Sequence, residues 1–335
     1  MHRLTLVFED GRSVAIDARP AETVYFAALR QKVRLETDCL EGACATCKAH
    51  CTQGEYELLD YSEEALSDQE KSEGFVLACR MRARSDCSIE FPYESAAALA
   101  KKPAGAFAAK VTSVERVCSA VVRLDLATQA AVGFLPGQYV HLNVPGSGAQ
   151  RSYSFANPPG EALKHRFYVK LIEGGAMSRW VAEQAGTGDE ILMNGPFGHF
   201  YLRQPRRPVL MLAGGTGLAP MLSMLEQLAA NGQTDQPVRL LYGANTPPEF
   251  FGLAQLESLR ARGLRLELEC VALEGGDGWS GATGHVTAHL RPEHVAGGCD
   301  AYLCGPPPMI DAARAWLKAQ GVADPAIHAE RFIAS

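Results

Sequence analysis

The chain has 335 residues, 47% hydrophobic and 21% charged, and its 32 basic and 38 acidic side chains give a formal net charge of −6 at pH 7. This composition is typical of a globular protein of two or three domains, at roughly 150 residues each. It argues against nucleic acid as a partner, because there is no basic excess. The charge is uneven, since residues 1–100 carry 18 acidic and 11 basic side chains.

The sequence also bears on location. Pro208 to Leu225 has no charged residue over 18 positions, which approaches the length of a membrane span. Four helix-breaking residues interrupt this stretch: Gly214, Gly215, Gly217 and Pro220. No charged and apolar leader marks a secretory signal. We therefore expect no membrane contact and a reducing cytoplasmic setting.

The first elements are a hairpin and a helix. Leu4, Leu6 and Phe8 alternate with polar residues, Asp10-Gly11 supplies a tight turn, and the alternation resumes at Val14. Residues 22–31 then have the spacing of a short amphipathic helix.

A cysteine loop follows, with Cys39, Cys44 and Cys47 spaced C-x4-C-x2-C and Cys79 further on. This spacing is that of plant-type [2Fe-2S] ferredoxins, in which a distant fourth thiolate completes the cluster. The alternatives are a structural zinc site, which usually has two close ligand pairs, and buried thiols that bind nothing. The sequence predicts a [2Fe-2S] electron carrier.

The rest of the N-terminal third is acidic. Between Glu55 and Glu73 lie eight carboxylates and one basic residue, Lys71. Such a run is either a solvated face or a docking surface for a basic partner. An Ala-rich segment from Ser95 to Gly105 carries Lys-Lys-Pro and predicts a linker.

Short strands separated by Gly and Pro turns, from Val111 to Leu142, predict a small antiparallel barrel. Arg151-Ser152-Tyr153-Ser154 lies on one of its strands, and Gly174-Gly175-Ala176-Met177-Ser178 opens a helix. A guanidinium and a helix N-terminus are suited to a pyrophosphate, and a tyrosine face to an isoalloxazine ring. Together they indicate a flavin site.

Beyond Pro205, strands and helices alternate, which predicts a parallel sheet. The strand at Val209 runs into Gly214-Gly215-Thr216-Gly217 and then a helix, an arrangement that brings backbone N–H groups to a dinucleotide phosphate. A simple tight turn is the alternative. Cys304-Gly305-Pro306 follows a second strand, at the sheet edge where ligands bind.

The nucleotide preference is predicted from the segment after the strand at Val238. An NADP enzyme would place basic residues there for the 2′-phosphate, but Glu249 is present and the next basic residue is Arg260. We expect NADH.

In this order, the motifs resemble the ferredoxin:NAD(P)H reductase superfamily with a ferredoxin domain fused in front. The segment Tyr61 to Asp86 and the ending Glu330-Arg331-Phe332 are similar to the reductases of benzoate and anthranilate 1,2-dioxygenases. The resemblance implies an α+β plant-type ferredoxin (β-grasp) at 1–95, a linker at 96–105, an antiparallel β-barrel FAD domain at 106–204 and an α/β parallel-sheet NAD domain at 205–335.

The resemblance also implies roles for individual residues. FAD is expected at Arg151, Ser152, Tyr153, Ser154, Gly174, Gly175, Met177 and Ser178, and NADH at Gly214, Gly215, Thr216, Gly217, Glu249, Gly305 and Pro306. Cys304 and Glu330 are expected near hydride transfer. Phe332 is expected to stack on the flavin, or otherwise to be a packed tail residue.

Nicotinamide delivers two electrons, whereas the cluster accepts one at a time, so a flavin must lie between them. The expected function is an NADH-dependent oxidoreductase of the ferredoxin–NAD(+) reductase type that feeds the terminal oxygenase of an aromatic carboxylate dioxygenase. The reductase of a soluble di-iron monooxygenase is the near alternative. A non-catalytic redox-sensing module is the distant one.

Overall fold

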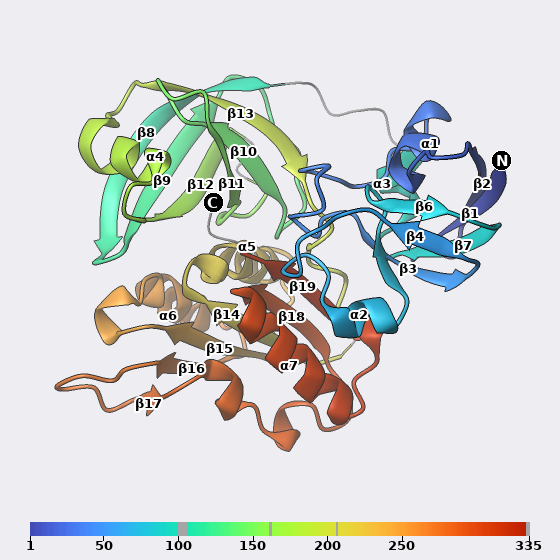
Figure 1. Ribbon diagram of the computed structural model, residues 1–335. Coiled ribbons are helices and arrows are strands. Elements are labelled where there is room, and N and C mark those ends of the chain that lie inside the picture. The colour runs from blue at the N-terminus through green and yellow to red at the C-terminus, as the bar shows by residue number, and fades with distance from the viewer. Residues whose placement is uncertain (100–105, 161–162, 206, 333–335) are drawn as a thin grey trace. The chain divides into compact units, whose positions relative to one another are not determined.

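The computed structural model describes residues 1–99, 106–160, 163–205 and 207–332 (Figure 1). Its contacts divide the chain into two compact units. The first is Met1–Pro103 together with Phe197–His199, and the second is the remainder of the chain. Each unit is described separately below.

The first unit has the predicted α+β fold. Its main sheet has the strand order β2-β1-β7-β3-β5, and β4 and β6 form a separate pair. The strands are β1 (His2–Phe8), β2 (Ser13–Ala18), β3 (Lys48–Gln53), β4 (Tyr56–Leu58), β5 (Phe75–Leu77), β6 (Met81–Ala83) and β7 (Cys87–Phe91), and the helices are α1 (Val24–Arg30), α2 (Asp68–Ser72) and α3 (Ser95–Leu99).

The predicted hairpin and helix are confirmed. Leu4 pairs with Ile16 across antiparallel β1 and β2, and Gly11 takes a positive φ of 77° in the turn. Helix α1 buries Val24, Ala27 and Ala28, the face that the sequence spacing indicates. The first part of the predicted linker is helical, because α3 occupies Ser95–Leu99 and buries Ala98. Residues 100–105 lie outside the described residues.

The second unit begins with a six-stranded antiparallel sheet in the order β11-β10-β13-β8-β9-β12, the predicted barrel. Its strands are β8 (Phe107–Cys118), β9 (Val121–Thr128), β10 (Tyr139–Asn143), β11 (Gln150–Ser154), β12 (Lys164–Lys170) and β13 (Glu190–Phe197). Helix α4 (Ala176–Arg179) continues into a π-helical turn η1 (Trp180–Gln184).

A parallel sheet with the order β17-β16-β15-β14-β18-β19 completes this unit. Its strands are β14 (Val209–Gly214), β15 (Val238–Ala244), β16 (Leu266–Ala272), β17 (Ala282–Thr283), β18 (Asp300–Gly305) and β19 (Ile327–Arg331). Helices α5 (Leu218–Ala230), α6 (Leu253–Ala261) and α7 (Pro307–Ala319) cover it, and short helical turns are η2 (Gly215–Gly217), η3 (Pro247–Glu249), η4 (Val286–His289), η5 (Pro292–His294) and η6 (Asp324–Ala326).

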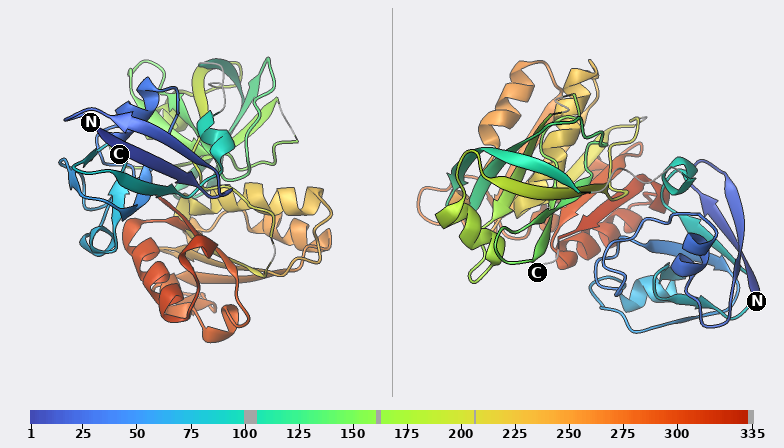
Figure 2. Two further views of the ribbon diagram at one scale, coloured as in Figure 1. Left: turned by 90° about the vertical axis from the view of Figure 1, so that its right-hand side faces the viewer. Right: turned by 90° about the horizontal axis from the view of Figure 1, so that it is seen from above.

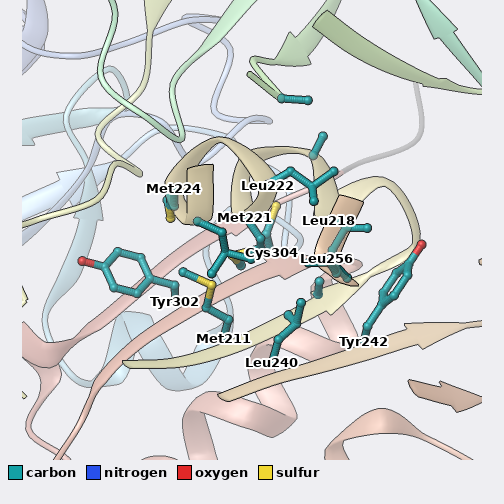
Figure 3. Close-up of a cluster of buried hydrophobic side chains, with 14 of the residues drawn as sticks. Met211, Leu218, Met221, Leu222, Met224, Leu240, Tyr242, Leu256, Tyr302 and Cys304 are labelled. Carbon is teal, nitrogen blue, oxygen red and sulfur yellow. The ribbon is translucent and has the colours of Figure 1, made fainter. Parts of the chain in front are cut away.

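Alternation along the parallel strands divides their side chains between two cores. Met211 of β14 belongs to the core beneath α5 and α6, whereas its neighbours Leu210 and Leu212 belong to the core beneath α7. Figures 1 and 2 show these helices on opposite faces of the sheet. Figure 3 shows part of the first core, where Met211 lies beneath Leu218 and Leu222 of α5. This core also includes Ala156 and Tyr168 of the barrel, so barrel and parallel sheet share one packed interior.

Among the described residues, no helix is both long and apolar enough to cross a membrane. The uncharged run from Pro208 to Leu225 is divided between β14, η2 and the first half of α5.

Candidate functional site

The cysteine loop is shaped by residues in left-handed backbone conformations. Leu40, Gly42 and Ala45 have φ values of 60°, 75° and 60°. A Cβ on Gly42 would lie 2.8 Å from side-chain carbons of both Tyr61 and Arg80, so glycine is required there for space as well as for conformation. The loop turns backbone amides toward sulfur, and Ala43 N donates to Cys39 Sγ at 3.3 Å.

The four thiols lie in two pairs. Cys47 Sγ is 3.2 Å from Cys79 Sγ, and both residues are buried, whereas Cys39 and Cys44 pair with each other and are half-buried. The hydrogen bond from Cys44 lowers the pKa of Cys39 to about 5, and the hydrogen bond from Cys47 lowers the pKa of Cys79.

This arrangement fits a two-iron cluster. Among the described side chains, no three His, Cys, Asp or Glu groups converge as they would around a single metal ion. A [2Fe-2S] cluster has four thiolate ligands, two for each of its irons. Two separate thiol pairs match that requirement.

The flavin motif lies on β11, where alternation separates its members. Arg151 and Tyr153 are half-buried on one face, and Arg151 is close enough to influence the phenol. Burial raises the pKa of Tyr153, which keeps the ring neutral. Ser152 is exposed on the other face and bonds to His141 Nδ1 at 3.1 Å. No sequence pattern indicated the His141 contact, which depends on the β10–β11 register.

The turn before α4 uses two of its side chains for its own structure. Ile172 N donates to Ser178 Oγ at 2.9 Å, and Met177 is buried in the barrel core. A Cβ on Gly175 would lie 2.9 Å from Ser178 Oγ, and Gly174 has a φ of 72°. Backbone N–H groups, rather than these side chains, are therefore what this turn offers to a phosphate.

The two glycine turns of the parallel sheet pack against each other. Ala213 pairs with Cys304 on adjacent strands β14 and β18, so both turns lie at one edge of the sheet. A Cβ on Gly217 would lie 2.1 Å from Cys304 O, and one on Gly214 would lie 2.9 Å from Met309 Sδ. These glycines allow the close approach, and Met309 fills the space that they leave. This packing role of Met309 was not predicted.

The C-terminal strand brings further residues to this edge. Glu330 pairs with Cys304 across β19 and β18, and Phe332 N donates to Gly305 O at 2.8 Å. Ser154 Oγ of the barrel donates to Glu330 Oε2 at 3.4 Å. Ser154, Cys304, Glu330 and Phe332 therefore meet where the barrel joins the parallel sheet.

Cys304 at this corner is a thiol rather than a thiolate. It is fully buried in the core shown in Figure 3, and burial followed by the charge of Glu330 raises its pKa well above the ordinary value. Phe332 is half-buried and packs against the same core. Arg331 points to the other face, where its nearly buried side chain pairs with Asp311 of α7. This ion pair, which was not predicted, joins β19 to α7.

Glu249 lies in η3 at the carboxyl end of β15, as predicted. Its carboxylate accepts from Asn245 Nδ2 and from Thr246 Oγ1, each at 3.2 Å. Arg260, the next basic residue after Glu249 in the chain, is engaged elsewhere, because it donates to Leu266 O and pairs with Glu257.

The sequence matches three family models in chain order. They are a 2Fe-2S iron-sulfur cluster binding domain over residues 7–84, an oxidoreductase FAD-binding domain over 108–201 and an oxidoreductase NAD-binding domain over 211–315. Together with the thiol pairs and the glycine turns, these matches define an NAD-dependent iron-sulfur flavoprotein oxidoreductase.

Relatives of full length place the chain more narrowly. It is 40% identical to the toluate 1,2-dioxygenase electron transfer component of Pseudomonas putida, covering 100% of this chain and 99% of the relative. It is 36% identical to the anthranilate 1,2-dioxygenase electron transfer component of Acinetobacter baylyi, covering 100% and 98%. The chain belongs to this family of electron transfer components, which confirms the resemblance predicted from its motifs.

Solved structures agree. The crystal structure of the Amycolatopsis cytochrome P450 reductase GcoB matches with a TM-score of 0.71 at 28% identity, over 98% of both chains. A ferredoxin reductase in carbazole 1,9a-dioxygenase matches with a TM-score of 0.68 at 26% identity, over 99% of both. The predicted cofactors, NADH, FAD and a [2Fe-2S] cluster, are confirmed as those of an electron transfer reductase.

Proposed function

We propose that this chain carries electrons from NADH to the terminal oxygenase of an aromatic carboxylate 1,2-dioxygenase in the cytoplasm. The observation that supports this proposal most directly is the full-length identity of 40% to a toluate 1,2-dioxygenase component. The propane 2-monooxygenase reductase of Rhodococcus jostii is 35% identical over 93% of this chain, so a monooxygenase partner is the second candidate.

In this proposal the chain supplies positions and the cofactors would supply the redox chemistry, with FAD linking the two-electron donor NADH to the one-electron cluster. The Gly214–Gly217 turn would hold the nicotinamide nucleotide by backbone N–H groups, and the Cys304–Pro306 turn packs against it. Arg151 and Tyr153 hold the flavin from the barrel. Phe332 covers the flavin at the corner that it shares with Ser154 and Glu330.

Hydride transfer at the corner formed by Ser154, Cys304, Glu330 and Phe332 would need no acid or base. Hydride transfer moves no separate proton through a side chain, and Cys304 keeps its own proton because of its raised pKa. Ser154 donates a hydrogen bond to Glu330, and this bond orients both side chains. We infer that these residues orient the nicotinamide ring and exclude water.

The acidic segment 55–73 is proposed as the surface that docks the oxygenase. Not every carboxylate of this segment is available to a partner. Glu70 is buried in an ion pair with Lys48 and caps α2. Glu57 pairs with Arg82 and Arg84. Exposed acidic residues that are left for a basic partner include Glu55, Glu63 and Asp68.

The test separates electron entry from electron exit. Replacing Cys79 by Ser removes a cluster ligand. The variant should keep NADH-dependent ferricyanide reduction, which the flavin can perform directly, and lose most cytochrome c reduction. If both activities fall together while FAD stays bound, the cluster does not lie downstream of the flavin.

The partner is tested by reconstitution. NADH-dependent oxygen uptake with a purified benzoate-type dioxygenase should exceed that with a di-iron phenol or propane monooxygenase. The reverse result would replace the dioxygenase by the second candidate.

A further inference from the structure

A third pair of thiols lies in the first unit, the ferredoxin unit, apart from the four proposed cluster ligands. Cys51 is near the end of β3, and Cys87 is the first residue of β7. Both are buried, with exposed fractions of 8% and 4%. Nothing in the electron path described above uses them.

The strand register places the two sulfurs on one face. β3 and β7 are antiparallel, with Cys51 opposite Ile89, so Cys87 is the diagonal neighbour of Cys51 on the same face. The register shifts between Cys51 and Gln53, which marks a β-bulge. A bulge increases the local twist of its strand, and here Thr52 and Gln53 are both exposed while Cys51 stays in the core.

The two thiols lie close enough for each to influence the pKa of the other. Cys51 Sγ also lies 3.4 Å from Gln53 O, and Cys87 Sγ lies 3.4 Å from Ser85 O. A Cβ on Gly54 would lie 2.6 Å from Cys87 Sγ, so the bulge closes tightly over this sulfur. Tyr56 is close enough for both thiols to affect the pKa of its phenol.

We propose that Cys51 and Cys87 form a reversible disulfide when the ferredoxin unit is exposed to a peroxide. Two S–H bonds break and one S–S bond forms, while the O–O bond of hydrogen peroxide is cleaved and two molecules of water are released. The two thiols lose two electrons and the peroxide gains them. The disulfide is reduced again by a dithiol.

The crosslink would join β3, which begins directly after Cys47, to β7, which begins eight residues after Cys79. Cys51 is four residues beyond the ligand Cys47, and Cys79 lies inside the loop that a bond between residues 51 and 87 would close. A disulfide restricts the unfolded chain, and the restriction increases with loop length. The bond therefore keeps β3 against β7, and Cys47 and Cys79 within reach of each other, when the cluster is damaged.

The reaction is expected to be slow, because the thiolate is the reactive form. Burial raises the pKa of Cys51 to about 12 and also raises the pKa of Cys87, where nearby Asp86 contributes. Slow formation suits a response to sustained oxidation rather than a step in turnover.

Peptide mapping of the intact holoprotein tests the proposal. The protein is exposed to hydrogen peroxide, unfolded in N-ethylmaleimide and digested with trypsin without reduction. Cleavage after Lys48, Lys71, Arg84 and Lys101 gives peptides 49–71 and 85–101, each with a single cysteine. We expect these peptides to appear linked, at their summed mass less two hydrogens, and to separate in dithiothreitol.

Controls make the result specific. Cys51→Ser and Cys87→Ser should each abolish the linked peptides, whereas Cys299→Ser, which removes another buried thiol with a raised pKa, should leave them. If the serine variants fail to fold, peptide mapping of the unaltered protein still shows whether Cys51 and Cys87 are linked. Two results would overturn the proposal. One is that both peptides carry maleimide at a peroxide dose that already oxidises the half-buried Cys270. The other is a disulfide between Cys51 and Cys79.

The proposed consequence has its own readout. A chelator should bleach the visible absorption of the cluster more slowly in the crosslinked protein than in the dithiothreitol-treated protein. Equal bleaching rates in the two proteins would refute the proposal that the crosslink keeps the cluster ligands together. Because this assay measures neither NADH oxidation nor oxygen uptake, its failure is distinct from failure of the proposed reductase function.

Discussion

Replacing Gly217 by Ala is the most direct test of how the two glycine turns pack at the end of the parallel sheet, where the nucleotide is proposed to bind. The new Cβ would lie 2.1 Å from the carbonyl oxygen of Cys304 and 2.7 Å from its carbonyl carbon. Both are backbone atoms, so no side chain can rotate away. The two turns must separate by about 1 Å to restore an ordinary contact, and overpacking of this kind costs about 1–3 kcal/mol.

The kinetic effect should exceed the loss of stability. Cys304 pairs with Glu330, and Gly305 O accepts from Phe332 N, so a displaced Cys304 turn moves the whole corner. A misplacement of about 1 Å can lower a rate by roughly 100-fold. Single-turnover stopped-flow measurement of flavin reduction by NADH should show a loss of about this size. The melting temperature should fall by roughly 2–12 °C in a domain of this size.

Gly232→Ala is the control. Gly232, just beyond the end of α5, has a left-handed backbone with a φ of 70°, and a Cβ there would meet nothing within 4 Å. Alanine should therefore cost about 1–2 kcal/mol of stability through its conformation and leave the rate of flavin reduction nearly unchanged. The reasoning is refuted if the Gly217→Ala protein is reduced by NADH at the original rate, or if the Gly232→Ala protein is slowed as much.

Three further outcomes are expected. Reduction of ferricyanide should favour NADH over NADPH by at least about tenfold in kcat/KM, or roughly 1.4 kcal/mol, and equal efficiencies would contradict the role given to Glu249. Removing the chain from Phe332 onward should change nicotinamide affinity and the rate of flavin reduction while FAD stays bound, and unchanged kinetics would make Phe332 a packed tail residue. Electron delivery to the oxygenase should fall as ionic strength rises while ferricyanide reduction stays constant, and delivery that does not respond to salt would assign segment 55–73 to a solvated face.

Local patterns in the sequence were enough to predict the elements. The turn at Asp10-Gly11 and the alternation around it specify a hairpin, and the strand after Pro208 had to be buried because it is continuously apolar. Sequence spacing also predicted which four cysteines would hold the cluster. It did not show that they form two pairs, because pairing depends on where the strand after Cys47 meets the turn at Cys79.

Side-chain roles within the motifs were harder to predict. Ser152 and Ser154 are two residues apart in one motif, yet Ser152 bonds to His141 and Ser154 to Glu330. The partners are 11 and 176 residues away along the chain, so no local pattern could indicate them. Met177 and Ser178 belong to a phosphate-binding turn by sequence, but their side chains support that turn from behind.

These placements bear on how the chain works. Ser154 comes from the barrel, Cys304 from the middle of the parallel sheet and Glu330 from the C-terminal strand, and each is held by a backbone register or a hydrogen bond. Cys304 keeps its proton because its pKa is raised, so it gives the corner no titrating thiol near neutral pH. Hydride transfer here should therefore depend on the spacing of the two glycine turns, and a change to either backbone should matter more than a change of pH.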